Sequence, residues 1–368
     1  MYAQIEAQVQ TLRDLPAKTT VTPVLLDSKG VRDWLTRANA AQTNHQALAD
    51  QSRLFVHLGL LPAGSSLEQM ELDLQAGQVI GFYDPDSKGL YVLSESGGVG
   101  AVEKITFSHE YTHALQDQNF GLDTLAIDTP DQSDRDLART ALPEGDATML
   151  MTQWSVKYMS LVDLIQIAGS SLSGPQTDQL ANAPPILRET LLFPYEDGLN
   201  FVQGIFDKGG WAAVDQLYAD PPDSTSQILH PELYAGGVKP VALAVPAVPS
   251  SLAGWKLTMQ DTLGELELRI WLEGIGSTGA SNSPAAAVSS WAGDRVGLYE
   301  GPNGQWAVVL RTQWRTAEGA TSFKAAAGKT LAGLKNPSSE CGDAMTEEIV
   351  IASDQAVIPA FSSCQSGA

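Results

Sequence analysis

The sequence predicts an α+β fold that is mostly helical, with a small α/β unit at its C-terminal end. Three observations support this prediction. The chain has 368 residues, enough for about two domains. Its first two thirds are rich in helical patterns, interrupted by one pair of short strand-like runs. Beyond about residue 290, strand-like runs surround a single helical segment. We therefore expect one unit at residues 1–275 and a second at 276–368.

The first part of the chain predicts two helices and a hairpin. Helices are expected at residues 3–14 and about 29–60, joined by the apolar stretch TVTPVLLD. The segment QVIGFYDPDSKGLYVL (78–93) contains two strand-like runs around DPDSKG, whose proline and glycine are typical of turns. We expect a β-hairpin there.

Helices dominate the next part of the chain. A helix is expected at 101–118, because Asn119 and Gly121 mark its end, and another at about 140–160. Residues 161–235 are expected to be mostly helical, with breaks at GPQTD, FPYEDG and ADPPDSTS. Residues 236–250 are rich in proline and small residues and form a candidate linker. The C-terminal unit then shows the strands RVGLYE, QWAVVLRTQW and EEIVIAS around a helix at about 316–332.

Composition excludes some classes of partner. The net charge of −21, from 22 basic and 43 acidic residues, argues against binding to nucleic acid or to an anionic membrane surface. No run of 18 apolar residues is present, so no membrane span is expected. The oligomeric state is left open.

The two cysteines, Cys341 and Cys364, are compatible with one disulfide in an oxidising compartment, or with two separate thiols. No signal peptide pattern is visible at the start of the sequence. We expect an extracellular or cell-envelope protein whose targeting segment is absent from this sequence.

The segment SHEYTHALQD (108–117) carries the strongest functional signal. His109 and His113 lie four residues apart, so a helix projects both imidazoles from one face, where they can bind one zinc ion. Glu110 is rotated by about 100° and is placed to take a proton from a water molecule. The alternative is a helix with two surface histidines and an incidental glutamate.

A catalytic zinc site needs a third protein ligand. Glu144, in ALPEGDATMLM, is the leading candidate, and Asp146 and Asp117 compete with it. Asp117 lies one turn beyond His113, which favours a role as hydrogen-bond acceptor for a ligand imidazole. Glu144 could instead be a charge that stabilises a helix N-terminus. We expect one Zn²⁺ per chain.

Two of these segments resemble a known clan of enzymes. HEYTHALQD is similar to the active-site helix of thermolysin-like and neprilysin-like metallopeptidases. PEGDAT resembles the NEGFA segment that supplies the third zinc ligand in the M1 aminopeptidases. Together they resemble the gluzincin clan, and the pattern GFYDPDSKGLYV, HEYTHALQDQ and EGDA also resembles a group of uncharacterised bacterial putative metallopeptidases. The match covers about residues 80–150.

The resemblance implies a zincin-like catalytic domain with His109, His113 and Glu144 as zinc ligands and Glu110 as general base. It also implies that one strand of the hairpin holds the substrate as an added strand, and that Tyr195 or His230 stabilises the oxyanion.

The sequence departs from the gluzincin pattern at two positions. Pro143 stands where the aminopeptidases have Asn, and Thr148 stands where the thermolysin-like enzymes have Asp. Asp117 or Asp146 is therefore expected to take over the contact to a ligand imidazole.

These observations predict a zinc-dependent peptidase that acts on a peptide or protein substrate. One alternative is a zinc-stabilised binding or structural protein, although an intact Glu110 is unnecessary for a scaffold. Another is a hydrolase of non-peptide amides or esters, because the same chemistry serves both.

Overall fold

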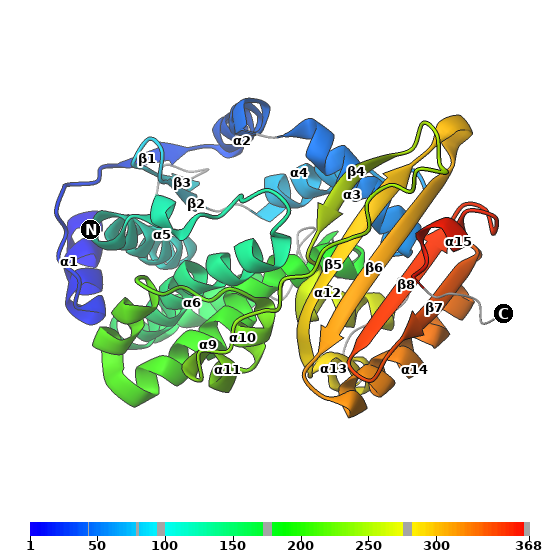
Figure 1. Cartoon of the computed structure of the whole chain (residues 1–368). Helices are drawn as coiled ribbons and strands as arrows, with labels where there is room; N and C mark the ends of the chain where they lie inside the picture. Colours follow the sequence, from blue (N-terminus) through cyan, green and yellow to red (C-terminus); the bar gives the residue numbers. More distant parts are fainter. Residues whose placement is uncertain (43, 79–80, 94–99, 172–178, 275–281, 364–368) are drawn as a thin grey trace.

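The computed structural model describes residues 1–42, 44–78, 81–93, 100–171, 179–274 and 282–363. It confirms a mixed α+β fold, with helices and two separate sheets of three and five strands. Figure 1 shows the five-stranded sheet on one side of the molecule and most of the helices on the other. Within the described ranges, no helix is long and apolar enough to cross a membrane.

The N-terminal two thirds of the chain form most of the helices and the smaller sheet. The elements are, in order, α1 (Tyr2–Arg13), β1 (Pro23–Leu26), α2 (Ser28–Gln42), α3 (His45–Leu58), α4 (Leu67–Gln78), β2 (Gly81–Asp84), β3 (Gly89–Leu93), α5 (Ala101–Phe120), a 3-10 turn at Leu122–Leu125, α6 (Ser133–Tyr158), α7 (Leu161–Ser171), α9 (Pro185–Leu217), α10 (Thr225–Leu229) and α11 (Pro231–Ala235).

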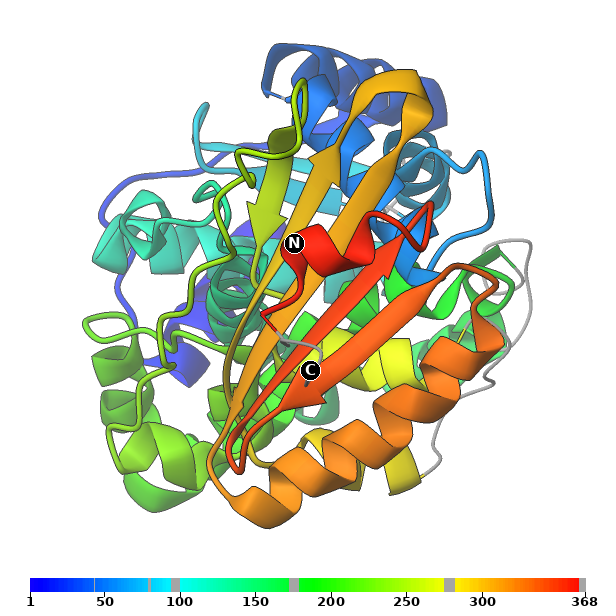
Figure 2. The same cartoon turned by 45° about the vertical axis from the view of Figure 1, so that its right-hand side comes forward.

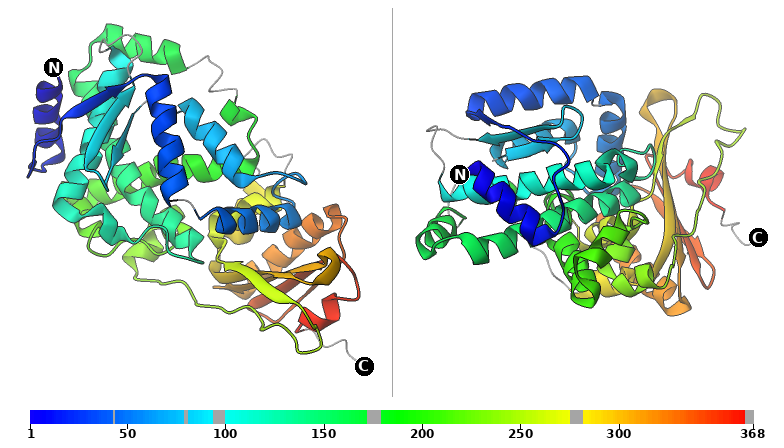
Figure 3. Two further views of the ribbon diagram at one scale, coloured as in Figure 1. Left: turned by 90° about the horizontal axis from the view of Figure 1, so that it is seen from above. Right: turned by 90° about the vertical axis from the view of Figure 1, so that its left-hand side faces the viewer.

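The predicted hairpin is confirmed as β2 and β3, and a third strand joins it. The apolar stretch before α2 forms β1, which pairs in parallel with β3, so the strand order is β1-β3-β2. Helix α5 packs on one face of this sheet through Leu90, Val92 and Phe107. Helix α2 covers the other face, where the Trp34 ring lies 4.1 Å from that of Phe82. Figure 3 shows this layering, and it leaves β2 as an edge strand beside α5.

Two helices run through residues at which the sequence predicts helix boundaries. Helix α6 begins at Ser133 rather than near 140, so Pro143 lies inside it. Helix α9 continues through FPYEDG, where a break was predicted, and contains Pro194. Its backbone departs from helical geometry at Gly210, where φ is 63°. Packing between the two helices overrides the local preference of proline, because it stabilises helix on both sides of each proline.

Helices α6 and α9 cross at two glycines. A Cβ atom on Gly145 would collide with the backbone of Gly198, and one on Gly198 would collide with the carbonyl group of Ala141. Neither position therefore tolerates a side chain at the present distance between the helices. This contact fixes how closely the two helices approach each other.

The C-terminal third forms the larger sheet and its covering helices. Its elements are β4 (Lys256–Asp261), α12 (Gly264–Glu273), α13 (Asn282–Val288), β5 (Trp291–Glu300), a 3-10 turn at Pro302–Gly304, β6 (Trp306–Trp314), α14 (Ala317–Gly333), β7 (Ser338–Gly342), β8 (Thr346–Ala352) and α15 (Ile358–Phe361).

The larger sheet is antiparallel throughout, with strand order β4-β5-β6-β8-β7 (Figure 2). The three predicted strands and the helix between them are confirmed as β5, β6, β8 and α14. Strands β4 and β7 were not predicted. Because β4 pairs with β5, the sheet begins about 20 residues before the expected boundary at 276. Cys341 lies in β7, and Cys364 lies outside the described residues, so the expected disulfide stays a prediction.

Buried carboxylates join elements that lie far apart in the chain. Asp261 at the end of β4 accepts a hydrogen bond of 2.9 Å from the backbone N–H of Ser133, where α6 begins. Asp134 of α6 accepts one of 3.0 Å from the N–H of Thr225, where α10 begins. Asp294 of β5 accepts bonds from Leu263 and Gly264 at the start of α12. Each carboxylate thus satisfies free N–H groups of a helix from another element.

The glycine crossing gives a test of the fold. We expect Gly198→Ala to lower the free energy of unfolding by roughly 1–3 kcal/mol, because its methyl group forces α6 and α9 apart. The control is Gly204→Ala, on the same helix, where a Cβ meets no atom within 4 Å. Alanine there should raise stability by about 0.5–1 kcal/mol, since it favours helix over glycine. Urea denaturation midpoints measure both, and equal effects would contradict the assigned role of Gly198.

The buried carboxylates give a second prediction, on pH. Burial raises the pKa of Asp134 to about 8, helped by the charges of Asp294 and Glu265 and opposed by hydrogen bonds from Thr225. An aspartate whose pKa is raised on folding costs no stability below its unfolded pKa of about 4, and destabilises the protein progressively as pH rises toward 8. Thermal stability should therefore fall between pH 5 and pH 8.

Asp134→Asn should flatten that decline, because the amide keeps the acceptor for Thr225 and carries no charge. Asp207→Asn, an exposed position on α9, should leave the pH dependence of the melting temperature as in the wild-type protein. An equal fall in the melting temperatures of the wild-type and Asp134→Asn proteins between pH 5 and pH 8 would contradict the raised pKa of Asp134.

Candidate metal centre

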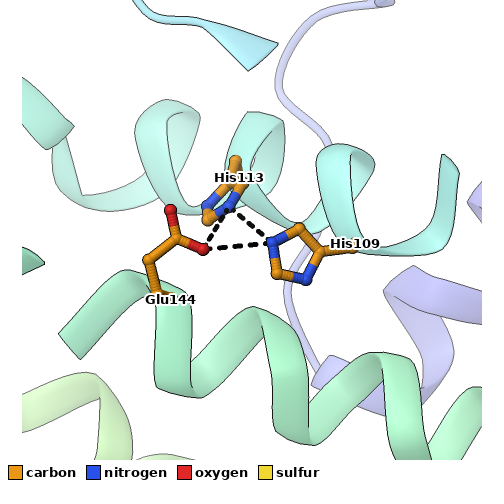
Figure 4. Close-up of side chains that lie close together, drawn as sticks. All are labelled: His109, His113 and Glu144. Carbon is orange, nitrogen blue, oxygen red and sulfur yellow. Dashed lines mark hydrogen bonds and ion pairs between the residues drawn. The ribbon is translucent and has the colours of Figure 1, made fainter. Parts of the chain in front are cut away.

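The two histidines of SHEYTHALQD lie on the buried side of α5. Their side chains point from successive turns toward the same space, as the spacing predicts (Figure 4). The Nε2 atoms of His109 and His113 are 3.0 Å apart. Both residues are buried or nearly so, which argues against the alternative of two incidental surface histidines.

Glu144 completes the cluster from α6. Its Oε2 atom lies 3.1 Å from Nε2 of His109 and 3.4 Å from Nε2 of His113. Glu144 lies 11 residues after the first residue of α6, so its carboxylate is not a charge at a helix N-terminus. Figure 4 shows the carboxylate reaching across from α6 to both imidazoles.

The three donor groups suit a zinc ion. Ligand atoms about 2.0–2.1 Å from a tetrahedral zinc lie roughly 3.3 Å from one another, close to the separations found here. Two imidazole nitrogens and one carboxylate oxygen are common zinc donors. In the part of the chain that the structure describes, this is the one group of His, Cys, Asp and Glu side chains close enough to hold a metal ion.

The cluster is strongly coupled electrostatically. Although burial opposes it, the charge of Glu144 raises the pKa of His113 to about 9. Burial also pushes the pKa of Glu144 upward, yet His113 and His109 hold it well below its usual range. Glu144 is therefore ionised and available as a ligand at any physiological pH.

Glu110 lies on α5 next to the two histidines and faces the small sheet. The backbone N–H of Tyr83 in β2 donates a hydrogen bond of 2.9 Å to its Oε2 atom. The strand approaches closely, because a Cβ atom on Gly81 would lie 2.7 Å from Cγ2 of Thr106 and 3.4 Å from Cγ of Glu110. Burial raises the pKa of Glu110, while the nearby imidazoles lower it. A raised pKa suits a carboxylate that must accept a proton.

Of the two candidates for stabilising an oxyanion, Tyr195 lies at the cluster. Its ring centroid is 6.2 Å from that of His109, and its side chain is 40% exposed. The charge of Glu144, followed by burial and the charge of Glu110, raises the pKa of Tyr195 well above its usual value. Its hydroxyl group therefore stays protonated and able to donate a hydrogen bond.

His230 is placed elsewhere, which corrects its assignment to the candidate site. It lies between α10 and α11, and its Nε2 atom is 2.7 Å from Oε1 of Glu265 in α12. Helix α10 meets α6 at Asp134, ten residues and about 15 Å of helix before Glu144. His230 thus contributes to the contact between the N-terminal part of the chain and α12, through its pairing with the buried Glu265.

The expected roles of Asp117 and Asp146 are also corrected. Asp117 accepts hydrogen bonds from the hydroxyl group of Tyr83 and from Lys88, each 2.7 Å long. Asp146 pairs with Arg13 of α1. The partner of the His113 imidazole is instead Gln116, whose Oε1 lies 2.8 Å from Nδ1. Gln116 in turn donates to the Pro143 carbonyl group, which anchors the imidazole to α6.

Three residues around the cluster were not predicted as site residues: Gln116, Tyr83 and Arg13. Gln116 lies one turn after His113 on the same helix, so its spacing was a readable signal. Tyr83 and Arg13 come from distant segments, and nothing local in the sequence links them to the motif. The buried side chain of Arg13 also lies over the Trp211 ring, 4.2 Å from its centroid.

Comparison with known proteins adds one finding. A family model described as a domain of unknown function (DUF8575) matches residues 255–362. The match spans the larger sheet, from just before β4 to α15, and contains none of the cluster residues. No curated protein and no solved structure matches the chain.

Proposed function

We propose that the protein is a zinc-dependent peptidase of gluzincin type. The observation that carries the proposal is the convergence of one donor atom each from His109, His113 and Glu144, all within 4.8 Å of one another. A zinc ion held there would lower the pKa of a water molecule and polarise a substrate carbonyl group. Glu110 beside this cluster distinguishes a hydrolytic centre from a structural zinc site, which needs ligands alone.

The residues around the cluster have distinct roles in this proposal. Glu110, held at one oxygen by Tyr83, accepts a proton from the attacking water and later passes it to the leaving amine. Tyr195 donates a hydrogen bond to the oxyanion that forms on the substrate. Gln116 keeps the imidazole of His113 oriented.

Strand β2 is suited to hold an extended substrate. It lies at the edge of the small sheet, and its Tyr83 contacts the general base directly. A peptide that pairs with an edge strand gains backbone hydrogen bonds independent of its side chains. A peptide added there would run past Glu110, as cleavage requires.

Metal binding is the first test of this proposal. Purified protein should contain about one zinc ion per chain, and His113→Ala should remove most of it, because two ligands are too few for tight binding. His45→Ala is the matched control, since His45 lies on α3 and pairs with Glu68. Metal content measured by atomic emission checks both. Stoichiometric zinc in a protein lacking both His109 and His113 imidazoles would disprove the assigned centre.

The second test separates an enzyme from a zinc-stabilised binding protein. Glu110→Gln should retain zinc and fold but lose activity by roughly 10²–10⁴-fold, because the amide cannot accept the proton. Hydrolysis should be measured on casein, mixed peptides and simple esters. If wild type and variant are equally inactive on all of these, the binding-protein alternative gains. Activity on esters alone would point to a non-peptide substrate.

A further inference from the structure

A cavity lies where α6 and α9 meet α3, α4 and α12. It has a volume of about 300 Å³ and is lined by residues from α3, α4, α6, α9 and α12. This is the lower end of the range for ligand pockets, and it suits one side chain better than a whole small molecule.

The cavity is lined in part by α6 and α9, the helices that carry Glu144 and Tyr195. Thr140 of α6 lines it and lies one turn, about 6 Å of helix, before Glu144. Thr190 of α9 also lines it and lies five residues, about 7.5 Å, before Tyr195. A residue two positions away along an extended peptide is about 6–7 Å away, so a substrate side chain can span this separation.

The charged groups of the cavity are all acidic. Its described lining contains the carboxylates of Glu71, Asp128, Asp136 and Glu267, and no Lys, Arg or His. Asp128 is exposed, whereas Glu267 is only 7% exposed. Carboxyl groups therefore line the cavity from the solvent to the interior.

Two of these carboxylates lack a partner. Among the described residues, neither Glu71 nor Glu267 makes a hydrogen bond or an ion pair, whereas Asp136 accepts from the backbone N–H of Thr129 and lies 3.7 Å from Arg135. Burial, then Glu68, raises the pKa of Glu71 to about 7. Burial, then Asp261, Asp134 and Asp294, raises that of Glu267 well above its usual value. A buried carboxylate without a partner costs free energy that a bound cation would recover.

The lining favours an organic cation over a metal ion. No set of three of its carboxylates comes close enough to coordinate one ion within the described structure. Phe55, Leu137 and Ile186 line the same cavity and offer apolar walls. Lysine and arginine side chains have an apolar stem and a cationic head, which match these walls and the buried carboxylates.

We propose that this cavity binds a lysine or arginine side chain of the peptide substrate, with Glu267 and Glu71 contacting its cationic group. The assignment of that side chain to a substrate rests on the peptidase proposed above. The enzyme would then select peptides that carry a basic residue near the cleaved bond.

Peptide pairs test this selectivity. Arginine is compared with its neutral isostere citrulline at each position around the cleaved bond. At one position kcat/KM should favour arginine by on the order of 10- to 100-fold, as expected for a desolvated charge pair. Glu71→Gln combined with Glu267→Gln should bring this ratio close to one. Glutamine removes each charge with little change in shape, and a melting temperature close to that of the wild-type protein checks that the double variant folds. Glu318→Gln, at an exposed position on α14, should leave the ratio unchanged.

A binding measurement separates this inference from the proposed function. Nα-acetyl-arginine methylamide and its citrulline counterpart are titrated into the full-length Glu110→Gln protein, with and without the two glutamine substitutions. If the protein binds the arginine compound selectively and the substitutions abolish this binding, the assignment of the cavity is supported even when no peptide is cleaved. In that case only the peptidase proposal fails. If peptides are cleaved without a preference for a basic residue, the assignment of the cavity is wrong and the peptidase proposal stands. The same conclusion follows if the preference requires a free N-terminal amine on the peptide. If neither peptide cleavage nor arginine-selective binding is observed, both the peptidase proposal and the assignment of the cavity are wrong.

Discussion

The close crossing of α6 and α9 at Gly145 and Gly198 is the constraint on which the candidate site depends. Glu144 precedes the first glycine by one residue, and Tyr195 precedes the second by three. Because backbone meets backbone at this point, the positions of both side chains relative to each other follow from the helix contact itself. Neither residue is carried by a loop, so their geometry does not need ordering when a ligand binds.

The segment PEGD shows how much structure four consecutive residues can determine. The carbonyl group of Pro143 receives Gln116, which orients one imidazole. Glu144 provides the carboxylate, and Gly145 permits the helix crossing. Asp146 pairs with the buried Arg13, and Tyr218 of the loop after α9 donates a further bond to it. The segment therefore joins α1, α5, α6 and α9 at one level of the fold, and this explains why a proline is accepted inside a helix.

The sequence predicted the parts of this protein that depend on local periodicity. The hairpin, the helix of His109 and His113 and three strands of the larger sheet were found, because each has its own hydrophobic pattern and turn residues. Long-range contacts were not readable: α6 begins earlier than expected because Asp261, over a hundred residues away, satisfies its first N–H group. The same limit applies to His230, since its pairing with Glu265 has no signal in the sequence around it.

Carboxylates join the helices to the larger sheet, and these contacts determine where the chain could be divided into parts that fold independently. The matched family model begins at residue 255, which would suggest a separable C-terminal module. However, Asp261 caps α6, and α6 carries Glu144. A chain ending near residue 250 would leave the first turn of α6 without its acceptor and expose the apolar residues that pack against the sheet. Recombination at that point would separate α6, the helix that carries Glu144, from the carboxylate that satisfies its first N–H group, so the matched family model and the folding unit do not coincide in this protein.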